Sequence, residues 1–373
     1  MSERKANRYS LVIIAVFVII IGGLSIINIL ISPPDILIRE RRVRERRPNL
    51  SLATFTSGDF MTSFEAYAAD SFPFRDSFRA LHAATVYGAL LQTDKDGVYF
   101  DSHGIGSFEA VNEQSVMLMA EKIIAVSEIL DELNIFYAFI PDKSVYADRA
   151  MPGFDYELTE RILAYRLNPD EFAFIPIIDV LSADSFYRTD LHWCQVNISD
   201  VAYAFGEAMG VEIDFQQFSR RYAGQFRGGY AGQFALPVRS ESLYFMYNPD
   251  MTAFYMNMGL REFEEGPVYD LEMFYGIDPY DIFLRGAQPL VVLENSNATS
   301  DRALYIFRDS FSSSLAPILA SAYSRVTLID FRFIDLRTVN QLIDFEPGSD
   351  ALFLFSSGIL NNSDMLLIPV QAE

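Results

Sequence analysis

Residues 303–330 read ALYIFRDSFSSSLAPILASAYSRVTLID. Within them, residues 303–307 form an apolar run of strand length, residues 308–311 form a turn, residues 312–323 have a helical pattern, and residues 326–330 form a second apolar run. Strands that are apolar along their whole length and alternate with helices indicate a largely parallel sheet covered on both faces. The stretch therefore predicts an α/β fold.

The same alternation continues on both sides of this stretch. The sequence predicts helices at 112–133, 156–167 and 197–209, and apolar strands at 135–140, 174–180, 289–293 and 351–355. Ligands of such folds bind beyond the carboxyl ends of the strands. We therefore look for functional residues in the loops that follow strands.

We divide the chain into three parts. Residues 1–32 are a cytoplasmic tail and membrane anchor, residues 33–75 are a membrane-proximal linker or short helices, and residues 76–373 are the α/β domain. Asp76 is expected to cap the first helix of this domain. Residues 97–108 have turn residues between two short strands and predict a tight hairpin.

Residues 211–290 differ from the rest of the domain and are interpreted as an insertion. They are rich in aromatic residues and glycine, with little periodicity. They contain the pentapeptide Tyr-Ala-Gly-Gln-Phe twice, at 222–226 and at 230–234. We expect a pair of edge strands or turns. The alternative is a carbohydrate-stacking surface, for which exposed aromatic side chains are suited.

The charge of the chain is unevenly distributed. The formal net charge is −21, and up to Pro48 nine basic residues stand against four acidic ones. The remainder carries 20 basic and 46 acidic residues. A body that acidic repels nucleic acid and anionic lipid surfaces. We therefore expect no nucleic-acid partner.

Residues 11–31 are 21 consecutive uncharged residues. As a helix they would extend over about 31 Å, the thickness of the hydrocarbon core of a bilayer. A cleaved signal peptide is the alternative, but the run is too long and no small-residue cleavage site follows it. We expect an uncleaved single-pass anchor.

The basic residues around this run do not decide its orientation. Three basic residues precede it and favour a cytoplasmic N-terminus, but six arginines follow it between Arg39 and Arg47. The single cysteine, Cys194, permits no intramolecular disulfide and so does not indicate a compartment. From charge alone the topology is undecided.

The candidate catalytic residues begin with Asp190-Leu191-His192-Trp193, in the loop after a predicted strand. An Asp two residues before a His is a plausible pair of general base and orienting carboxylate. Ser310 follows the strand at 303–307 and precedes a helix, so it is expected at the same sheet edge. Ser310 is then the candidate nucleophile, His192 the general base and Asp190 the residue that orients the imidazole.

Each of these residues also has a structural interpretation. Ser310 could be a helix cap, Asp309 could have only that role, and Ser312 or Ser313 could be the important serine. The other two histidines are predicted on a helix face and in a hairpin turn, which gives no metal-ligand spacing. No glycine-rich phosphate loop is present. We expect no metal and no cofactor.

Several motifs together resemble a known family. They are Phe-Pro-Phe-Arg-Asp-Ser-Phe at 72–78, Gly-Val-Tyr-Phe at 97–100, Ile-Pro-Asp-Lys at 140–143 with Tyr146 after it, the tetrapeptide at 190–193, and Asp-Ser-Phe at 309–311. On these motifs the chain resembles the DHHW proteins of Gram-positive bacteria. It resembles more distantly the periplasmic SGNH-like proteins of alginate O-acetylation.

The resemblance implies an SGNH-hydrolase-like α/β domain outside the cytoplasm, with Ser310, His192 and Asp190 as its triad. It further implies O-acetylation of a cell-surface or exported polysaccharide, with a multi-pass membrane acyltransferase as a possible supplier of acyl groups. Leu191 departs from the family name, which implies His at that position, and the usual SGNH glycine and asparagine oxyanion blocks are not identifiable. Ser356, Ser357 and Asn361 are possible donors.

Two functions remain open from the sequence. The first is a membrane-anchored serine O-acetyltransferase or esterase that acts on a polysaccharide. The second is a non-catalytic glycan-binding or assembly factor on the same fold, which would use the aromatic insertion. Trp193 is expected to pack the loop rather than to contact substrate.

Overall fold

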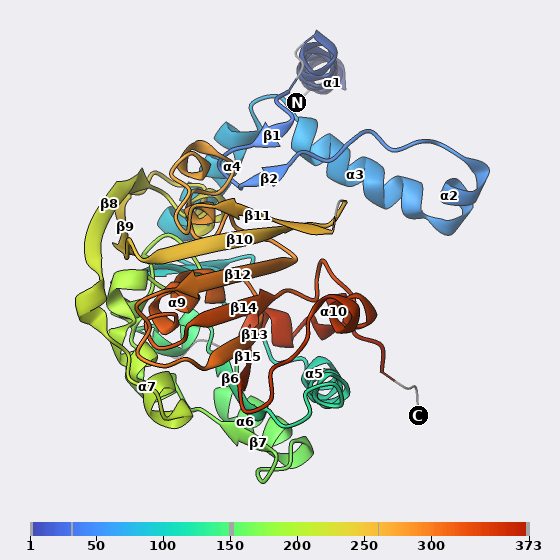
Figure 1. Cartoon of the computed structure of the whole chain (residues 1–373). Coiled ribbons are helices and arrows are strands. Elements are labelled where there is room, and N and C mark those ends of the chain that lie inside the picture. Colours follow the sequence, from blue (N-terminus) through green and yellow to red (C-terminus); the bar gives the residue numbers. More distant parts are fainter. Residues whose placement is uncertain (1–2, 31–32, 149–152, 260, 371–373) are drawn as a thin grey trace. The chain divides into compact units, whose positions relative to one another are not determined.

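The computed structural model describes residues 3–30, 33–148, 153–259 and 261–370 (Figure 1). It divides into two compact units, residues 1–92 and 93–373. The helix at Arg75–Ala83, which the sequence analysis assigns to the α/β domain, belongs to the first unit.

The first unit begins with the long apolar helix α1. Within α1 (Glu3–Leu30), the segment Tyr9–Asn28 is long and apolar enough to cross a membrane. The stretch expected to be a linker or short helices is largely folded. It contains the strands β1 (Ile36–Leu37) and β2 (Arg42–Val43) and the helices α2 (Leu52–Ser57) and α3 (Asp59–Ser71), and α4 (Arg75–Ala83) follows.

Asp76 does not cap α4 as predicted. The residue before the helix is Phe74, whose φ of 59° is in the left-handed region, and no side chain caps the helix at that position. Asp76 lies in the first turn, and its carboxylate is 3.3 Å from Arg39 Nε. The helix continues as one π-helical segment, Ala84–Ala89.

The second unit is built on an eight-stranded sheet with the order β11-β10-β12-β14-β13-β15-β6-β7. The five strands from β14 to β7 are parallel, and β12, β10 and β11 extend the sheet in antiparallel fashion. The strands are β6 (Asn134–Ile140), β7 (Phe172–Phe174), β10 (Met251–Asn257), β11 (Glu262–Gly266), β12 (Leu290–Asn295), β13 (Ala303–Arg308), β14 (Arg325–Ile329) and β15 (Asp350–Ser356). The predicted α/β fold with a mostly parallel sheet is confirmed.

Helices cover both faces of this sheet (Figure 1). One apolar cluster contains residues of α7 (Ser199–Met209) and α9 (Ser312–Leu319), and the other contains residues of α5 (Glu113–Ser127), α6 (Tyr156–Arg166) and α10 (Leu336–Leu342). Alternate residues of β15 belong to opposite clusters, with Leu352 and Leu354 in the first and Phe353 and Phe355 in the second. This alternation shows which face each strand residue points to.

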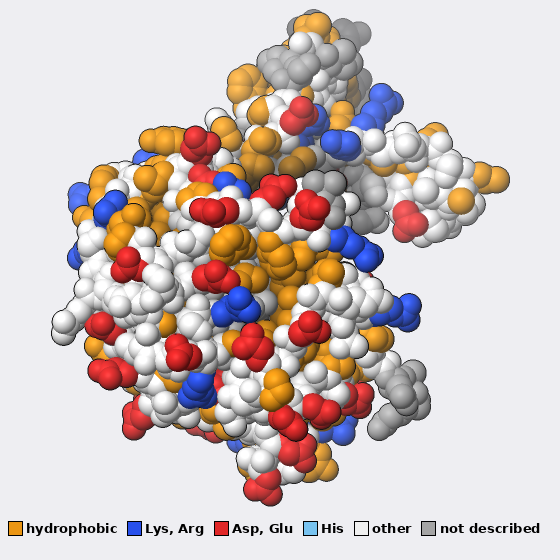
Figure 2. Space-filling model, viewed as in Figure 1, with side chains coloured by type: hydrophobic (Ala, Val, Ile, Leu, Met, Phe, Trp, Pro, Cys, Tyr) orange, Lys and Arg blue, Asp and Glu red, His pale blue; other side chains and the backbone are white. Residues whose placement is uncertain are grey.

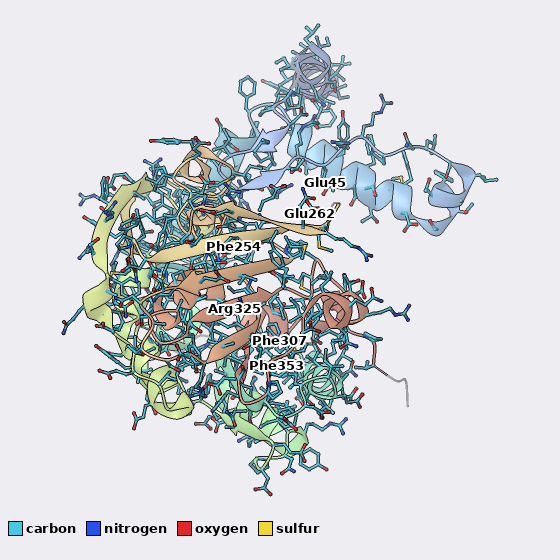
Figure 3. The ribbon with its side chains drawn as sticks, in the orientation of Figure 1. Glu45, Phe254, Glu262, Phe307, Arg325 and Phe353 are labelled. Carbon is cyan, nitrogen blue, oxygen red and sulfur yellow. The ribbon has the colours of Figure 1, made fainter. Side chains whose placement is uncertain are left out.

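The phenylalanines of the second cluster can be followed in Figure 3, where Phe307 on β13 and Phe353 on β15 are labelled. Their rings stack with centroids 4.6 Å apart, in the register that pairs these two residues across the parallel strands. In the same orientation, Figure 2 shows hydrophobic side chains gathered on the visible face of the molecule. Phe254 and Val292 help to line a shallow groove of about 530 Å³ there.

The strand predicted at 174–180 is wrong except at Phe174. The observed strand β7 is Phe172–Phe174, and residues Ile178–Val180 form a 3-10 turn. Pro176 lies between them and has no N–H to donate to a ladder, which explains why the pairing stops there.

The predicted hairpin at 97–108 is present. It consists of β4 (Val98–Asp101) and β5 (Gly104–Ser107), with β3 (Asp94–Lys95) as a third strand. Gly104 has a φ of 121°, and a Cβ at this position would lie 2.1 Å from Arg188 O. The hairpin therefore packs directly against the loop that carries Asp190.

The region interpreted as an insertion has two parts. Strands β8 (Ser219–Phe226) and β9 (Glu241–Tyr247) form a separate antiparallel pair, whereas β10 and β11 belong to the central sheet. The expectation of edge strands or turns holds for the first pentapeptide only, because the second copy lies in the helix α8 (Gly229–Phe234). Phe226, Tyr230 and Phe234 are buried and only Tyr222 is exposed, so the repeat does not form a stacking surface.

Candidate active site

Ser310 lies where β13 ends and α9 begins, at the carboxyl edge of the parallel strands. His192 and Asp190 come from a tight loop before α7. In this loop Phe186 and Trp193 form a β-bridge, and the Tyr187 N–H donates to His192 O at 3.0 Å. These two backbone contacts close a short loop that carries both Asp190 and His192.

The structure brings the three predicted side chains together. Ser310 Oγ lies 2.8 Å from His192 Nε2, and Asp190 Oδ1 lies 2.7 Å from His192 Nδ1. Asp190 is 1% exposed and His192 6% exposed, whereas Ser310 is partly exposed. A serine open to substrate is thus backed by a buried imidazole and a buried carboxylate, the arrangement that activates a serine for acyl transfer.

The imidazole ring packs against two aromatic side chains. Tyr280 stacks flat on it, with centroids 3.8 Å apart and an interplanar angle of 6°, and Phe311 packs against it at 4.9 Å. The Tyr280 hydroxyl donates to Ser314 Oγ in α9 at 2.7 Å. Tyr280 therefore fixes the plane of the ring that must meet Ser310 at one nitrogen and Asp190 at the other.

Trp193 packs the loop, as expected. Its side chain is 0% exposed, and its indole N–H donates to Phe311 O at 3.1 Å and to Ser314 Oγ at 2.8 Å. These bonds tie the loop of His192 to the first turn of α9. The distance between His192 and Ser310 is thereby set by buried contacts outside the pair itself.

The region interpreted as an insertion supplies the contacts that orient Asp190. The Gly229 N–H donates to Asp190 Oδ2 at 3.0 Å, while the His192 N–H donates to Oδ1 at 3.1 Å. The Gly228 N–H donates to Thr189 Oγ1 at 2.7 Å. A Cβ at Gly228 would lie 2.1 Å from Thr189 O, so only glycine allows this approach.

Glu241 at the start of β9 holds the same loop from another side. Its carboxylate accepts the N–H groups of Arg188 and Thr189, both at 2.8 Å, and the Thr189 hydroxyl. The three donors belong to the two residues that precede Asp190. By accepting all of them, the Glu241 carboxylate restrains the loop that carries Asp190 and His192.

Lys143 is a buried cation that links the hairpin to this loop. It follows β6, and its Nζ donates to Ile105 O at 2.9 Å and to Tyr187 O at 2.6 Å. Burial lowers the pKa of Lys143 from 10.5 to about 8, against the opposing effect of Glu241, Asp190 and Asp101. The negative charge of Asp190 in the candidate site therefore acts on the Lys143 ammonium group.

Asp309 has a role beyond that of a helix cap. Its Oδ1 accepts the Phe311 N–H at 3.0 Å, and its Oδ2 accepts the Ser356 N–H of the neighbouring strand β15 at 2.7 Å. Asp309 therefore fixes the turn that presents Ser310.

The remaining sequence candidates lie elsewhere. His82 is exposed on α4, and His103 lies in the hairpin turn, where its Nε2 is 3.2 Å from Asp148. Ser312 and Ser313 are buried in the first turn of α9. Tyr280, Glu241 and the pair Gly228-Gly229 were not found from the sequence. The one sequence feature that could have indicated the contact made by these glycines is the Gly-Gly pair between the two copies of the repeat. Adjacent glycines indicate that another backbone segment can approach closely.

Comparison with known proteins gives matches among solved structures only. No protein-family model and no curated protein matches the chain. A DHHW family protein from Eubacterium siraeum superposes with a TM-score of 0.59 at 17% sequence identity, over 75% of this chain and 98% of that one. The chain has the fold of this protein. Bacillus cereus PatB1, in a structure with a sulfonyl adduct, gives a TM-score of 0.55 at 17% identity, over 71% and 96%.

A third match is the O-acetyltransferase domain of Pseudomonas putida AlgJ, with a TM-score of 0.42 at 14% identity, over 71% of this chain and 92% of that one. The shared fold rests on the DHHW family protein and on PatB1. The resemblance to DHHW proteins that the motifs indicate is thus confirmed for the α/β fold.

The contact at Gly228 predicts a sharp difference between two neighbouring glycines. In Gly228→Ala the methyl group displaces Thr189 and with it Asp190, so we expect the hydrogen bond between His192 Nδ1–H and Asp190 to weaken. In Gly229→Ala the N–H to Asp190 remains and a Cβ meets nothing within 4 Å. Proton NMR of the full-length protein should show the downfield Nδ1–H resonance of His192 in Gly229→Ala but not in Gly228→Ala. Equal spectra would contradict this account.

The lowered pKa of Lys143 predicts how stability varies with pH. Between pH 8 and 10 the unfolded chain keeps the lysine proton and the folded chain loses it, so the free energy of unfolding rises with pH by at most about 1.4 kcal/mol per unit. Lys143→Met removes this term. Urea unfolding in detergent can be followed by the fluorescence of the single Trp193. The free energy of unfolding of the wild type should rise relative to that of the variant from pH 8 to 10. A constant difference would be inconsistent with a buried, proton-releasing lysine.

Proposed function

We propose that the chain is a membrane-anchored, extracytoplasmic serine O-acetyltransferase or esterase that acts on a cell-surface or exported polysaccharide. The observation that carries the proposal is the continuous series of contacts from Ser310 Oγ through the His192 ring to Asp190. The choice of acyl chemistry is supported by the fold shared with PatB1, whose structure carries a sulfonyl adduct. The polysaccharide substrate and the membrane acyl supplier rest on the resemblance seen in the sequence.

The first half of the reaction forms an acyl-enzyme. Ser310 Oγ attacks the carbonyl carbon of a donor ester, and its proton passes to His192 Nε2. Asp190 accepts the hydrogen bond from His192 Nδ1–H and stabilises the imidazolium. The bond from the carbonyl carbon to the donor oxygen then breaks, and His192 returns the proton to that leaving oxygen.

The second half transfers the acyl group. A hydroxyl of the acceptor attacks the acyl carbon and gives its proton to His192 Nε2. The bond from that carbon to Ser310 Oγ breaks, and Oγ takes the proton back. A sugar hydroxyl as acceptor gives transfer and water gives hydrolysis, so the same three residues serve both activities.

The non-catalytic alternative loses its main support in this structure. It relied on the aromatic residues of the repeat, and Phe226, Tyr230 and Phe234 are buried. Gly229, whose N–H holds Asp190, lies immediately before the second copy. The segment between the two copies therefore has a positioning role that suits an enzyme.

The proposal predicts that a serine-directed fluorophosphonate labels the full-length protein at Ser310. We expect Ser310→Ala to abolish labelling and His192→Ala to slow it by about three orders of magnitude or more, because the serine then lacks its base. The matched control is Ser312→Ala, two residues from Ser310. It removes a buried hydroxyl that has no hydrogen-bond partner among the residues the structure describes. Labelling should persist in that control. Labelling that persists in Ser310→Ala would reject Ser310 as the nucleophile.

The proposed topology places residues 93–373 outside the cytoplasm, and the single buried Cys194 makes this simple to test. Tyr275 is 87% exposed, so Tyr275→Cys introduces one accessible thiol. We expect a membrane-impermeant maleimide to label this variant in intact protoplasts, with the wild-type chain as an unlabelled control. Labelling only after permeabilisation would place the domain in the cytoplasm.

A further inference from the structure

Ser356 lies beside the turn that carries Ser310, at the carboxyl edge of the sheet. The parallel pairing of β13 and β15 ends with Arg308 opposite Leu354, and β15 continues to Ser356. The direct contact between the two segments is made by Asp309, the residue before Ser310. The Asp309 carboxylate fixes this arrangement, because it accepts the Ser356 N–H at 2.7 Å where a strand carbonyl would otherwise do so.

The side chain of Ser356 points to the same face of the sheet as His192. Leu352 and Leu354 belong to the apolar cluster that contains Trp193 and Phe311, whereas Phe353 and Phe355 belong to the opposite cluster. Side chains alternate along a strand, so Ser356 is on the face of Leu354. Ser356 is also partly exposed, which leaves its hydroxyl accessible to a bound substrate.

The Ser356 hydroxyl is available as a donor. Within the described part of the chain it forms no hydrogen bond, and neither does the backbone N–H of Ser310. The Phe311 N–H, the next donor in the turn, is already taken by Asp309 Oδ1. Asn361 is also taken, since its amide bonds Ala110 O and the Asn112 N–H.

We propose that Ser356 is a further catalytic residue, whose hydroxyl donates, together with the Ser310 N–H, to the oxyanion of the tetrahedral intermediate. This inference rests on the proposed function. When Ser310 Oγ bonds to the carbonyl carbon, the carbonyl oxygen becomes an alkoxide, and two donors at the sheet edge stabilise the charge that develops there. The Ser356 proton stays on its own oxygen throughout, and the alkoxide returns to a carbonyl when the leaving group departs.

A serine at the end of β15, beside the turn of the nucleophile, supplies this hydrogen bond from the parallel sheet. The sheet is rigid and holds the donor in place before substrate arrives.

The test uses the full-length protein and the hydrolysis of p-nitrophenyl acetate. We expect Ser356→Ala to lower kcat by about 100-fold or more while KM changes little, because the bond strengthens only in the transition state. Ser356→Thr and Ser356→Val are a matched pair. Both introduce a β-branched side chain of the same shape, which suits a strand, but only threonine keeps the hydroxyl. Thr should retain most of the wild-type kcat, and Val should lose it to the same extent as Ala.

The outcomes separate this inference from the proposed function. Activity that survives Ser310→Ala, or a wild type that neither turns over the ester nor reacts with fluorophosphonate, would reject both. Loss in Ser310→Ala together with a kcat in Ser356→Ala within threefold of wild type would reject only the role of Ser356. A loss in the neighbouring Ser357→Ala but not at 356 would reassign the donor. If Ser356→Ala does not fold, equal kcat values for Thr and Val would overturn the inference.

Discussion

The carboxylate of Asp309 joins two parallel strands at the point where the candidate site begins. By accepting the N–H groups of Phe311 and Ser356, it ends the ladder of β13 and starts the turn into α9. Ser310 is presented by that turn. The first turn of α9 in turn contacts Trp193 and Tyr280 through Ser314, so the placement of His192 also depends on where this helix begins.

The imidazole of His192 is therefore positioned by elements that are far apart in the sequence. Its own loop supplies Asp190, the region after β8 supplies the Gly229 N–H, and the segment before β12 supplies Tyr280. The contact with Asp190 is buried, and that with the Gly229 N–H is partly buried. Such fixed surroundings reduce the reorganisation needed when a proton moves from serine to histidine.

The sequence predicted the parts of this arrangement that are encoded locally. Apolar runs identified the parallel strands β6, β13, β14 and β15, and the order strand, turn and helix identified Ser310 as an edge residue. The two Tyr-Ala-Gly-Gln-Phe copies show what local sequence cannot determine, because one pairs with β9 as a strand and the other forms a helix against β4 and β5. Their surroundings decide the conformation. The contacts of Tyr280, Gly228 and Glu241 likewise depend on long-range packing.

The arginines after the apolar helix show the same dependence in the first unit. Arg42 contacts both oxygens of Asp70 at 2.7 and 2.6 Å and lowers the pKa of that carboxyl, while Glu40 accepts Arg75 and Arg79. Counted along the sequence, the cluster between Arg39 and Arg47 opposes a cytoplasmic N-terminus. Folded, two of these arginines pair with acidic residues from later in the chain, Arg39 with Asp76 and Arg42 with Asp70. These two arginines thus have a structural role within the first unit that their positions in the sequence do not reveal.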